Sequence, residues 1–199
     1  MSEENRRAVL AAAAAAIGEL GYQRATTREI CRRAGVSSGT FFHYFPSKLA
    51  VLRGILAEDL AEATTTWQQR LAAAERDPDG ALDAWFGDVV AEADDPGIAA
   101  FAAAIAGAGD DPEVSNLLEG RSRLDLEGLT AVVGLGRSAA SWHGTRAADR
   151  TAALLAIVAD GIATRAIEDP ALDVADIRGD LHEVVDAVVG RTGRSRPSA

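Results

Sequence analysis

The stretch Ala34–Lys48 has the sequence AGVSSGTFFHYFPSK, and it contains the signals that decide the fold of the N-terminal part of the chain. Gly35 is suited to the left-handed backbone conformation that ends a helix and turns the chain sharply. Ser37 is a preferred cap for the start of a further helix. The stretch therefore predicts the end of one short helix, a tight turn and a second short helix over residues 38–44.

The residues before this stretch predict the first helix of the pair. Thr26, Thr27, Arg28 and Glu29 have the pattern of a capping box, in which the Thr26 hydroxyl accepts the Glu29 N–H and the Glu29 carboxylate accepts the Thr26 N–H. A helix over residues 26–34, a tight turn and a second helix form the helix-turn-helix pattern, whose second helix enters the major groove of DNA. The small core that holds the two helices together is predicted to comprise Ile30, Ala34, Val36, Phe41 and Phe45.

The remaining side chains of this segment suit contact with a duplex. Arg28 can reach a guanine edge or a phosphate, while His43, Tyr44 and Lys48 are left for the duplex backbone. The second helix begins with small polar residues that allow close approach and offer N–H groups to a phosphate; these are Ser38, Gly39 and Thr40.

Composition and charge fit an all-α protein with one basic end. The 199 residues are 48% hydrophobic but only 5% aromatic, with abundant alanine, which favours helices. The net charge is −10, yet residues 1–48 carry seven basic and four acidic side chains. A locally basic patch can bind a polyanion because salt screens the more distant acidic charges.

Helical periodicity and four Asp-Pro pairs predict the remaining elements. The longest apolar run, residues 8–17, is too short for a membrane span, so a cytoplasmic protein is expected. The single cysteine, Cys31, excludes an internal disulfide and is expected to be buried. Residues 191–199 form a polar tail that is expected to be disordered. Helices are predicted near residues 4–20, 26–34, 38–44, 47–74, 80–93, 97–108, 113–134, 146–168 and 173–190.

The run GYQRATTREICRRAGVSSGTFFHYFPSKLAVL, Gly21–Leu52, resembles the DNA-binding domain of the tetracycline-repressor (TetR) family. The resemblance lies in the Gly-Tyr before the cap, the AGVS turn, the Gly-Thr after it and the His-x-Phe-x-x-Lys ending. It implies a helix-turn-helix domain over residues 1–47 and a larger helical domain over residues 48–190 that binds a small molecule and dimerises. It further implies a homodimeric regulator, usually a repressor, that dimerises through the helices near 146–168 and 173–190. The preference for arginine over lysine and the abundance of alanine suggest a bacterial source.

The resemblance also assigns residues to DNA contact. Phe42 stands where the family usually has tyrosine, so a hydroxyl often used on the phosphate backbone is missing. Two recognition helices in a dimer imply a near-palindromic operator with half-sites about 34–36 Å apart. The helix from Ser47 to Ala74 is expected to transmit effector binding to the DNA-binding domain. The positions that match family contacts to DNA are Thr27, Arg28, Ser38, Gly39, Thr40, His43, Tyr44 and Lys48, together with the altered Phe42.

The effector site is less defined by the sequence. Large aromatic groups in an alanine-rich domain line either a pocket or a core, and a Gly/Ser-rich stretch over Gly134–Thr145 is either a loop above a pocket or a surface connection. The identity of the effector does not follow from these residues. The candidates for ligand contact are Trp67, Trp85, Phe86, Phe101, Trp142 and His143.

Other function classes have weaker support. Ser141, His143 and Asp149 contain the residue types of a catalytic triad but lack a nucleophile elbow, so no enzyme is expected. His143 and His182 lack partners at metal-binding spacing, so neither a metal nor a cofactor is expected. Two alternatives to a ligand-released repressor stay open: an activator, and a DNA-binding and dimerisation module without an effector.

Overall fold

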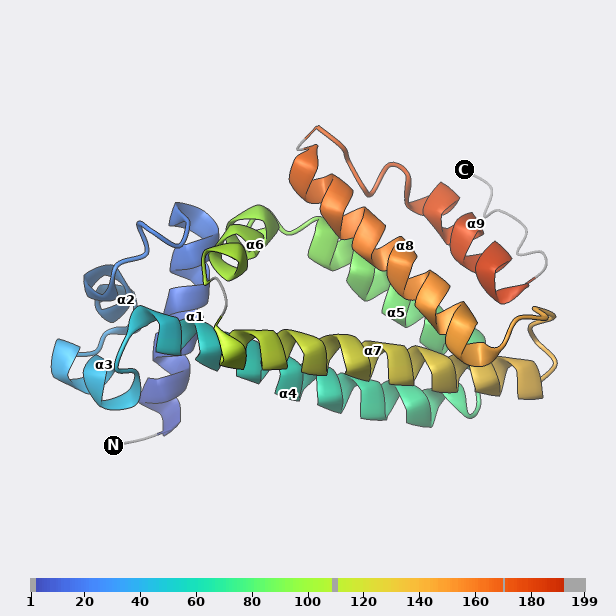
Figure 1. Cartoon of the computed structure of the whole chain (residues 1–199), viewed down its shortest axis with the longest axis horizontal. Helices are drawn as coiled ribbons and strands as arrows, with labels where there is room; N and C mark the ends of the chain where they lie inside the picture. The colour runs from blue at the N-terminus through green and yellow to red at the C-terminus, as the bar shows by residue number, and fades with distance from the viewer. Residues whose placement is uncertain (1–2, 109–110, 170, 192–199) are drawn as a thin grey trace. The chain divides into compact units, whose positions relative to one another are not determined.

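The computed structural model describes residues 3–108, 111–169 and 171–191. These residues form nine α-helices and no strand, which confirms the all-α prediction (Figure 1). The helices are α1 (Glu3–Leu20), α2 (Thr27–Ala34), α3 (Ser38–Tyr44), α4 (Lys48–Ala74), α5 (Pro78–Ala93), α6 (Ile98–Gly107), α7 (Pro112–Ser138), α8 (Ala148–Glu168) and α9 (Arg178–Val189).

The predicted helix ends differ from the structure mainly at α7 and α9. Helix α7 continues to Ser138, so the first five residues of the expected Gly134–Thr145 loop are helical. Glycine disfavours a helix interior, but Gly136 has a packing reason, since a Cβ there would lie 2.4 Å from the Trp142 ring. Helix α9 begins only at Arg178, although Val174 before it is already buried in the core.

The chain divides into two compact units. The first unit comprises Met1–Ala63 and Asp95–Arg121, and the second comprises Thr64–Asp94 and Ser122–Ala199. This division differs from the predicted boundary between residues 47 and 48. Helix α6 belongs with α1 because Ala104 is fully buried in the core that α1 lines. Asp111, just before α7, belongs to the same unit because Arg53 of α4 donates to its carboxylate at 3.0 and 2.5 Å.

The core of the first unit joins α1, α2, α3 and the start of α4. Ile30 and Phe41 are fully buried, Phe45 is buried, and Ala34 and Val36 pack against them in part. The predicted helix-turn-helix core is therefore confirmed. Cys31 is buried as a free thiol, also as expected.

The core of the second unit contains most of the large aromatic side chains. Trp67, Trp85, Phe86 and Trp142 are buried together with aliphatic residues of α5, α7, α8 and α9. Helix α8 packs against both α5 and α9. None of the helices in the described residues has the length and apolar content needed to cross a lipid bilayer.

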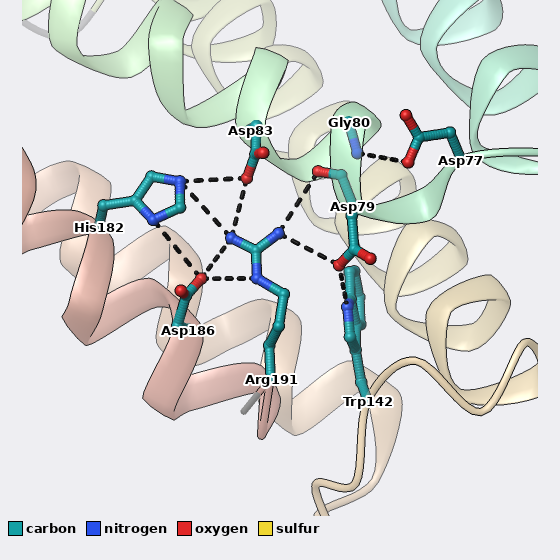
Figure 2. A network of polar contacts seen from close by, with 8 residues as sticks. All are labelled: Asp77, Asp79, Gly80, Asp83, Trp142, His182, Asp186 and Arg191. Atoms are coloured by element: carbon teal, nitrogen blue, oxygen red, sulfur yellow. Dashed lines mark hydrogen bonds and ion pairs between the residues drawn. The ribbon is translucent and has the colours of Figure 1, made fainter. Parts of the chain in front are cut away.

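Arg191 corrects the predicted tail. It is buried, and its guanidinium lies between α5 and the end of α9 (Figure 2). It donates to Asp83 at 2.8 Å and to Asp186 at 2.7 Å, and lies 3.2 Å from the Asp79 carboxylate. Two carboxylates distant in the sequence, Asp79 and Asp83, and the nearby Asp186 thus hold Arg191 in place, although its polar sequence neighbours predicted a disordered tail. Residues 192–199 lie outside the described residues.

Candidate nucleic-acid interface

Helix α2 begins with half of the predicted capping box. The Thr26 hydroxyl accepts the Glu29 N–H at 3.2 Å, as predicted. The predicted reciprocal bond from the Thr26 N–H to the Glu29 carboxylate is wrong. The carboxylate instead accepts from Arg32 at 2.6 and 2.9 Å and from Arg33 at 2.7 Å. Charged donors form stronger hydrogen bonds to a carboxylate than a backbone N–H does, so the two arginines prevail.

The turn between α2 and α3 has the predicted geometry. Gly35 is left-handed with φ 66°, and its N–H caps the Cys31 carbonyl. The Ser37 hydroxyl accepts the Thr40 N–H at 3.0 Å and so caps α3. A short helix-turn-helix follows, with seven residues in its second helix.

Helix α3 separates a buried from an exposed side. Phe41 is fully buried, whereas Ser38, Gly39, Phe42 and His43 are exposed. Positions three and four apart share one helix face, so these four residues form a single exposed face, called here the α3 outer face. Four of the predicted DNA contacts are therefore brought together.

The other predicted contacts on and after α3 are less accessible. Thr40 is half-buried, and its hydroxyl lies 2.9 Å from that of Ser37. Tyr44 packs in part against the core of the first unit. Lys48 donates from Nζ to the Tyr22 carbonyl at 2.6 Å and lies 4.1 Å from the centre of the Tyr22 ring. Partial burial lowers the pKa of Lys48.

Helix α2 presents one free cation beside two paired ones. Arg32 and Arg33 bind Glu29, and Arg33 also lies 2.8 Å from Glu19 of α1. Hydrogen bonds from Arg32 and Arg33 lower the pKa of Glu29 to about 2. Arg28 is exposed and has no ion pair with any residue that the structure describes, while Thr27 beside it is half-buried.

Four of the six candidates for effector contact share the core of the second unit, and the other two lie outside that core. Trp67 and Trp142 are buried in the second unit, where their indole N–H groups donate to Asp125 and Asp79, each at 2.7 Å. Phe101 lies in the first unit and packs against its core, which the sequence could not show because α6 was assigned to the other domain. His143 is exposed. Trp85 and Phe86 are buried core residues of the second unit.

The polar cluster around Arg191 was missed by the sequence reasoning. His182 lies 3.1 Å from Asp83 and 3.6 Å from Asp186 (Figure 2). Its ring also meets that of Phe86 edge to face. A signal existed in the i, i+4 spacing of Asp79 and Asp83 and of His182 and Asp186. Within the described part of the chain, no group of three or more His, Cys, Asp or Glu side chains is placed to hold a metal ion.

Comparison with known proteins gives the same segment a family. The family model described as "Bacterial regulatory proteins, tetR family" matches residues 9–55, which contain the helix-turn-helix. The transcriptional regulator UidR of Escherichia coli K12 is 31% identical over 68 residues, 34% of this chain and 35% of UidR. The transcriptional regulator BetI of Klebsiella pneumoniae is 36% identical over 80 residues, 40% of each chain. The chain thus matches between about a third and two fifths of the length of these relatives, both of which are described as transcriptional regulators.

Solved structures are similar over nearly the whole chain. A TetR transcription regulator from Haloarcula marismortui has a TM-score of 0.77 at 17% identity, covering 94% of this chain and 97% of its own. The regulator FadR from Bacillus subtilis, solved with stearoyl-CoA, has a TM-score of 0.69 at 16% identity, covering 94% and 99%. At this identity the structures establish the fold of the remaining helices, and the sequence matches establish the family of the N-terminal segment. Residues 9–55 of the chain therefore match the model of the TetR family of bacterial regulatory proteins, and the whole chain shares its fold with solved structures that include a TetR transcription regulator.

Proposed function

We propose that this protein is a transcriptional regulator that binds DNA through α2 and α3. The observation that carries the proposal is the α3 outer face, which leaves Ser38, Gly39, Phe42 and His43 exposed while Phe41 anchors the helix in the core. A recognition helix needs this division, because one side must hold the fold while the other enters the major groove.

Individual residues then take distinct roles in the complex. Arg28 forms no ion pair with a described residue, so its guanidinium is available to donate hydrogen bonds to a guanine edge or a phosphate. Lys48 contacts a phosphate from its position over Tyr22, since an ammonium group has three donors and one is used. Thr27, Thr40 and Tyr44 are only partly exposed and contribute at the margin of the interface.

The regulator acts as a homodimer through α8 and α9. These two helices pack on each other, and each leaves a large apolar side chain exposed: Ile157 is 63% exposed and Val184 is 45% exposed. Burial of such side chains against a second copy is favourable. Two α3 helices would then contact a near-palindromic operator with half-sites about 34–36 Å apart.

The regulator acts by repression and is released from DNA by a small molecule, as its resemblance to the TetR family implies. Effector binding in the second unit would lower operator affinity by favouring another conformation, with α4 as the element that transmits the shift. The FadR structure was solved with stearoyl-CoA, so one fold neighbour has a small-molecule partner. A dimer without an effector is the second candidate, because Trp67 and Trp142 are buried core residues with satisfied indole groups.

Fluorescence anisotropy tests the DNA-binding role. The purified protein is titrated onto duplexes from the intergenic region beside its own gene, with a scrambled duplex of equal composition as control and with salt varied. Specific, salt-sensitive binding is expected, and Arg28→Ala should weaken it by about tenfold or more. Arg150→Ala, which removes an exposed arginine of α8, is the matched control and should have little effect. Equal affinity for both duplexes would contradict sequence-specific regulation by this region.

A further inference from the structure

Phe42 is an unusual residue for an exposed helix face. Its side chain is 52% exposed, and it is the only aromatic side chain among the large apolar residues that the described part of the chain leaves exposed. It lies on the α3 outer face, between Ser38 one turn before it and the adjacent His43. Burying apolar surface in the middle of a proposed binding face contributes most to the binding free energy when the partner also has an apolar group at that point.

The Phe42 ring already contacts a buried neighbour on one side. It meets the ring of Phe41 edge to face, with centres 5.2 Å apart and planes at 83°. Phe41 is itself fully buried and packs near Phe45. Binding through Phe42 therefore costs little conformational entropy, since its neighbour already restricts the ring.

Hydrogen-bond donors and acceptors on this helix are partly committed within the protein. The hydroxyls of Ser37 and Thr40 lie 2.9 Å apart, and the Ser37 hydroxyl also accepts the Thr40 N–H. Phe42 has no donor or acceptor in its side chain, so it cannot bind a phosphate as a tyrosine hydroxyl could. In the major groove, the apolar feature that distinguishes one base from the others is the 5-methyl group of thymine.

Resting on the proposed DNA-binding function, we infer that Phe42 determines specificity by packing its ring against the 5-methyl group of one thymine in each half-site. The residue is thus a base-reading group in its own right, and the absent hydroxyl changes what α3 recognises. Loss of one methyl contact should weaken binding about fourfold per half-site, and by roughly tenfold or more when both half-sites are changed.

The test begins with the full-length protein and a random pool of duplex DNA. Sequences enriched by binding are resynthesised with each thymine replaced in turn by deoxyuridine, which removes only the methyl group, and affinities are measured by anisotropy. The wild type should show one symmetry-related pair of sensitive thymines. Phe42→Ala should bind the thymine and deoxyuridine duplexes equally, whereas Leu118→Ala, which removes an exposed apolar side chain of α7, should retain the wild-type ratio.

An independent readout uses the wild type alone. 5-Iododeoxyuridine at the sensitive thymine places iodine where the methyl group stood, and ultraviolet crosslinking should attach that base to the peptide containing Phe42. A crosslink to another peptide, no sensitive thymine, or an unchanged ratio in Phe42→Ala would overturn the inference. A protein that enriches no sequence at all would overturn the proposed function, and the inference with it.

Discussion

Arg191 is the residue whose surroundings differ most from those that its sequence neighbours suggest. Its guanidinium is buried and donates to the carboxylates of Asp83 and Asp186, with Asp79 at 3.2 Å. Burial opposes its charge, but the hydrogen bonds that the guanidinium donates to Asp83 and Asp186 outweigh that cost and raise its pKa. Arg191 therefore links the end of α9 to α5 as a permanent cation.

Arg191→Ala should destabilise the protein. The substitution removes the arginine charge from Asp79, Asp83 and Asp186, although Asp79 keeps the Trp142 indole N–H and the other two keep His182 nearby. The expected loss in free energy of unfolding is about 3 kcal/mol, the lower end for a broken buried ion pair, because the acidic partners remain partly exposed. Urea unfolding followed by circular dichroism measures the loss. Arg150→Ala, at an exposed position of the same unit, is the control. A loss no larger than that of the control would show that the cluster adds no stability.

Residues whose partners are close in the sequence were predictable, and residues with distant partners were not. Thr26, Gly35 and Ser37 act on backbone groups within a few positions, so their roles followed from local pattern. Arg191 binds Asp83, which is 108 residues away, and no local pattern contains that contact. The same reason explains Lys48, whose partner Tyr22 precedes it by 26 residues.

At the scale of elements, ion pairs fix α2 against α1. Arg33 of α2 binds Glu19 of α1 at 2.8 Å and Glu29 of its own helix at 2.7 Å, and Arg32 also binds Glu29. Glu29 thus positions the arginine that joins the two helices. The orientation of α2, which carries Arg28, depends in part on this carboxylate.

The contribution of Glu29 to stability should depend on pH. Its pKa is lowered from 4.5 to about 2 in the folded protein by hydrogen bonds from Arg32 and Arg33, so the folded state favours the charged form. The stabilisation is therefore fully present above about pH 4.5 and is lost as the pH falls towards 2. Thermal unfolding of wild type and Glu29→Gln should show a Tm difference that is largest near pH 7 and shrinks below pH 4.5.

The control for this experiment is Glu119→Gln. Glu119 is exposed on α7 and has no ion pair with a described residue, so its substitution should change Tm little at any pH. A Tm difference for Glu29→Gln that stays constant from pH 7 to pH 3 would mean that the carboxylate charge does not stabilise the contact between α1 and α2.

Helix positions followed from sequence better than helix ends did. Apolar periodicity and caps located every helix that the described residues form, since these signals are local. The end of α7 was missed because the Gly/Ser-rich stretch Gly134–Thr145 suggested a loop, whereas Gly136 within it makes room for the Trp142 ring. Tertiary packing thus overrode an unfavourable intrinsic preference.

At the scale of the whole molecule, the sequence predicted a helix-turn-helix domain and a larger helical domain, but not which residues each compact unit contains. The basic character of residues 1–48 and the helix-turn-helix motif pointed to one DNA-binding end. Residues 95–121 join that unit through Ala104 and the pairing of Arg53 with Asp111, which are contacts between separate stretches of the chain. Phe101 of α6 also lies in the first unit, so it is not an aromatic residue of the second unit's core.

Ile157→Asp should convert the proposed dimer into monomers. Ile157 is 63% exposed on α8, and a carboxylate there would have to be buried without a partner when two copies associate. Sedimentation equilibrium should give the mass of one chain for the variant and of two chains for the wild type, while circular dichroism remains unchanged. Leu126→Asp, an equivalent change at an exposed apolar position of α7, should leave the dimer intact. Operator affinity should fall when dimerisation is lost, because a monomer has one α3 and contacts only one half-site. An Ile157→Asp protein that remains dimeric would exclude this face of α8 as the interface and require another route by which two recognition helices are paired.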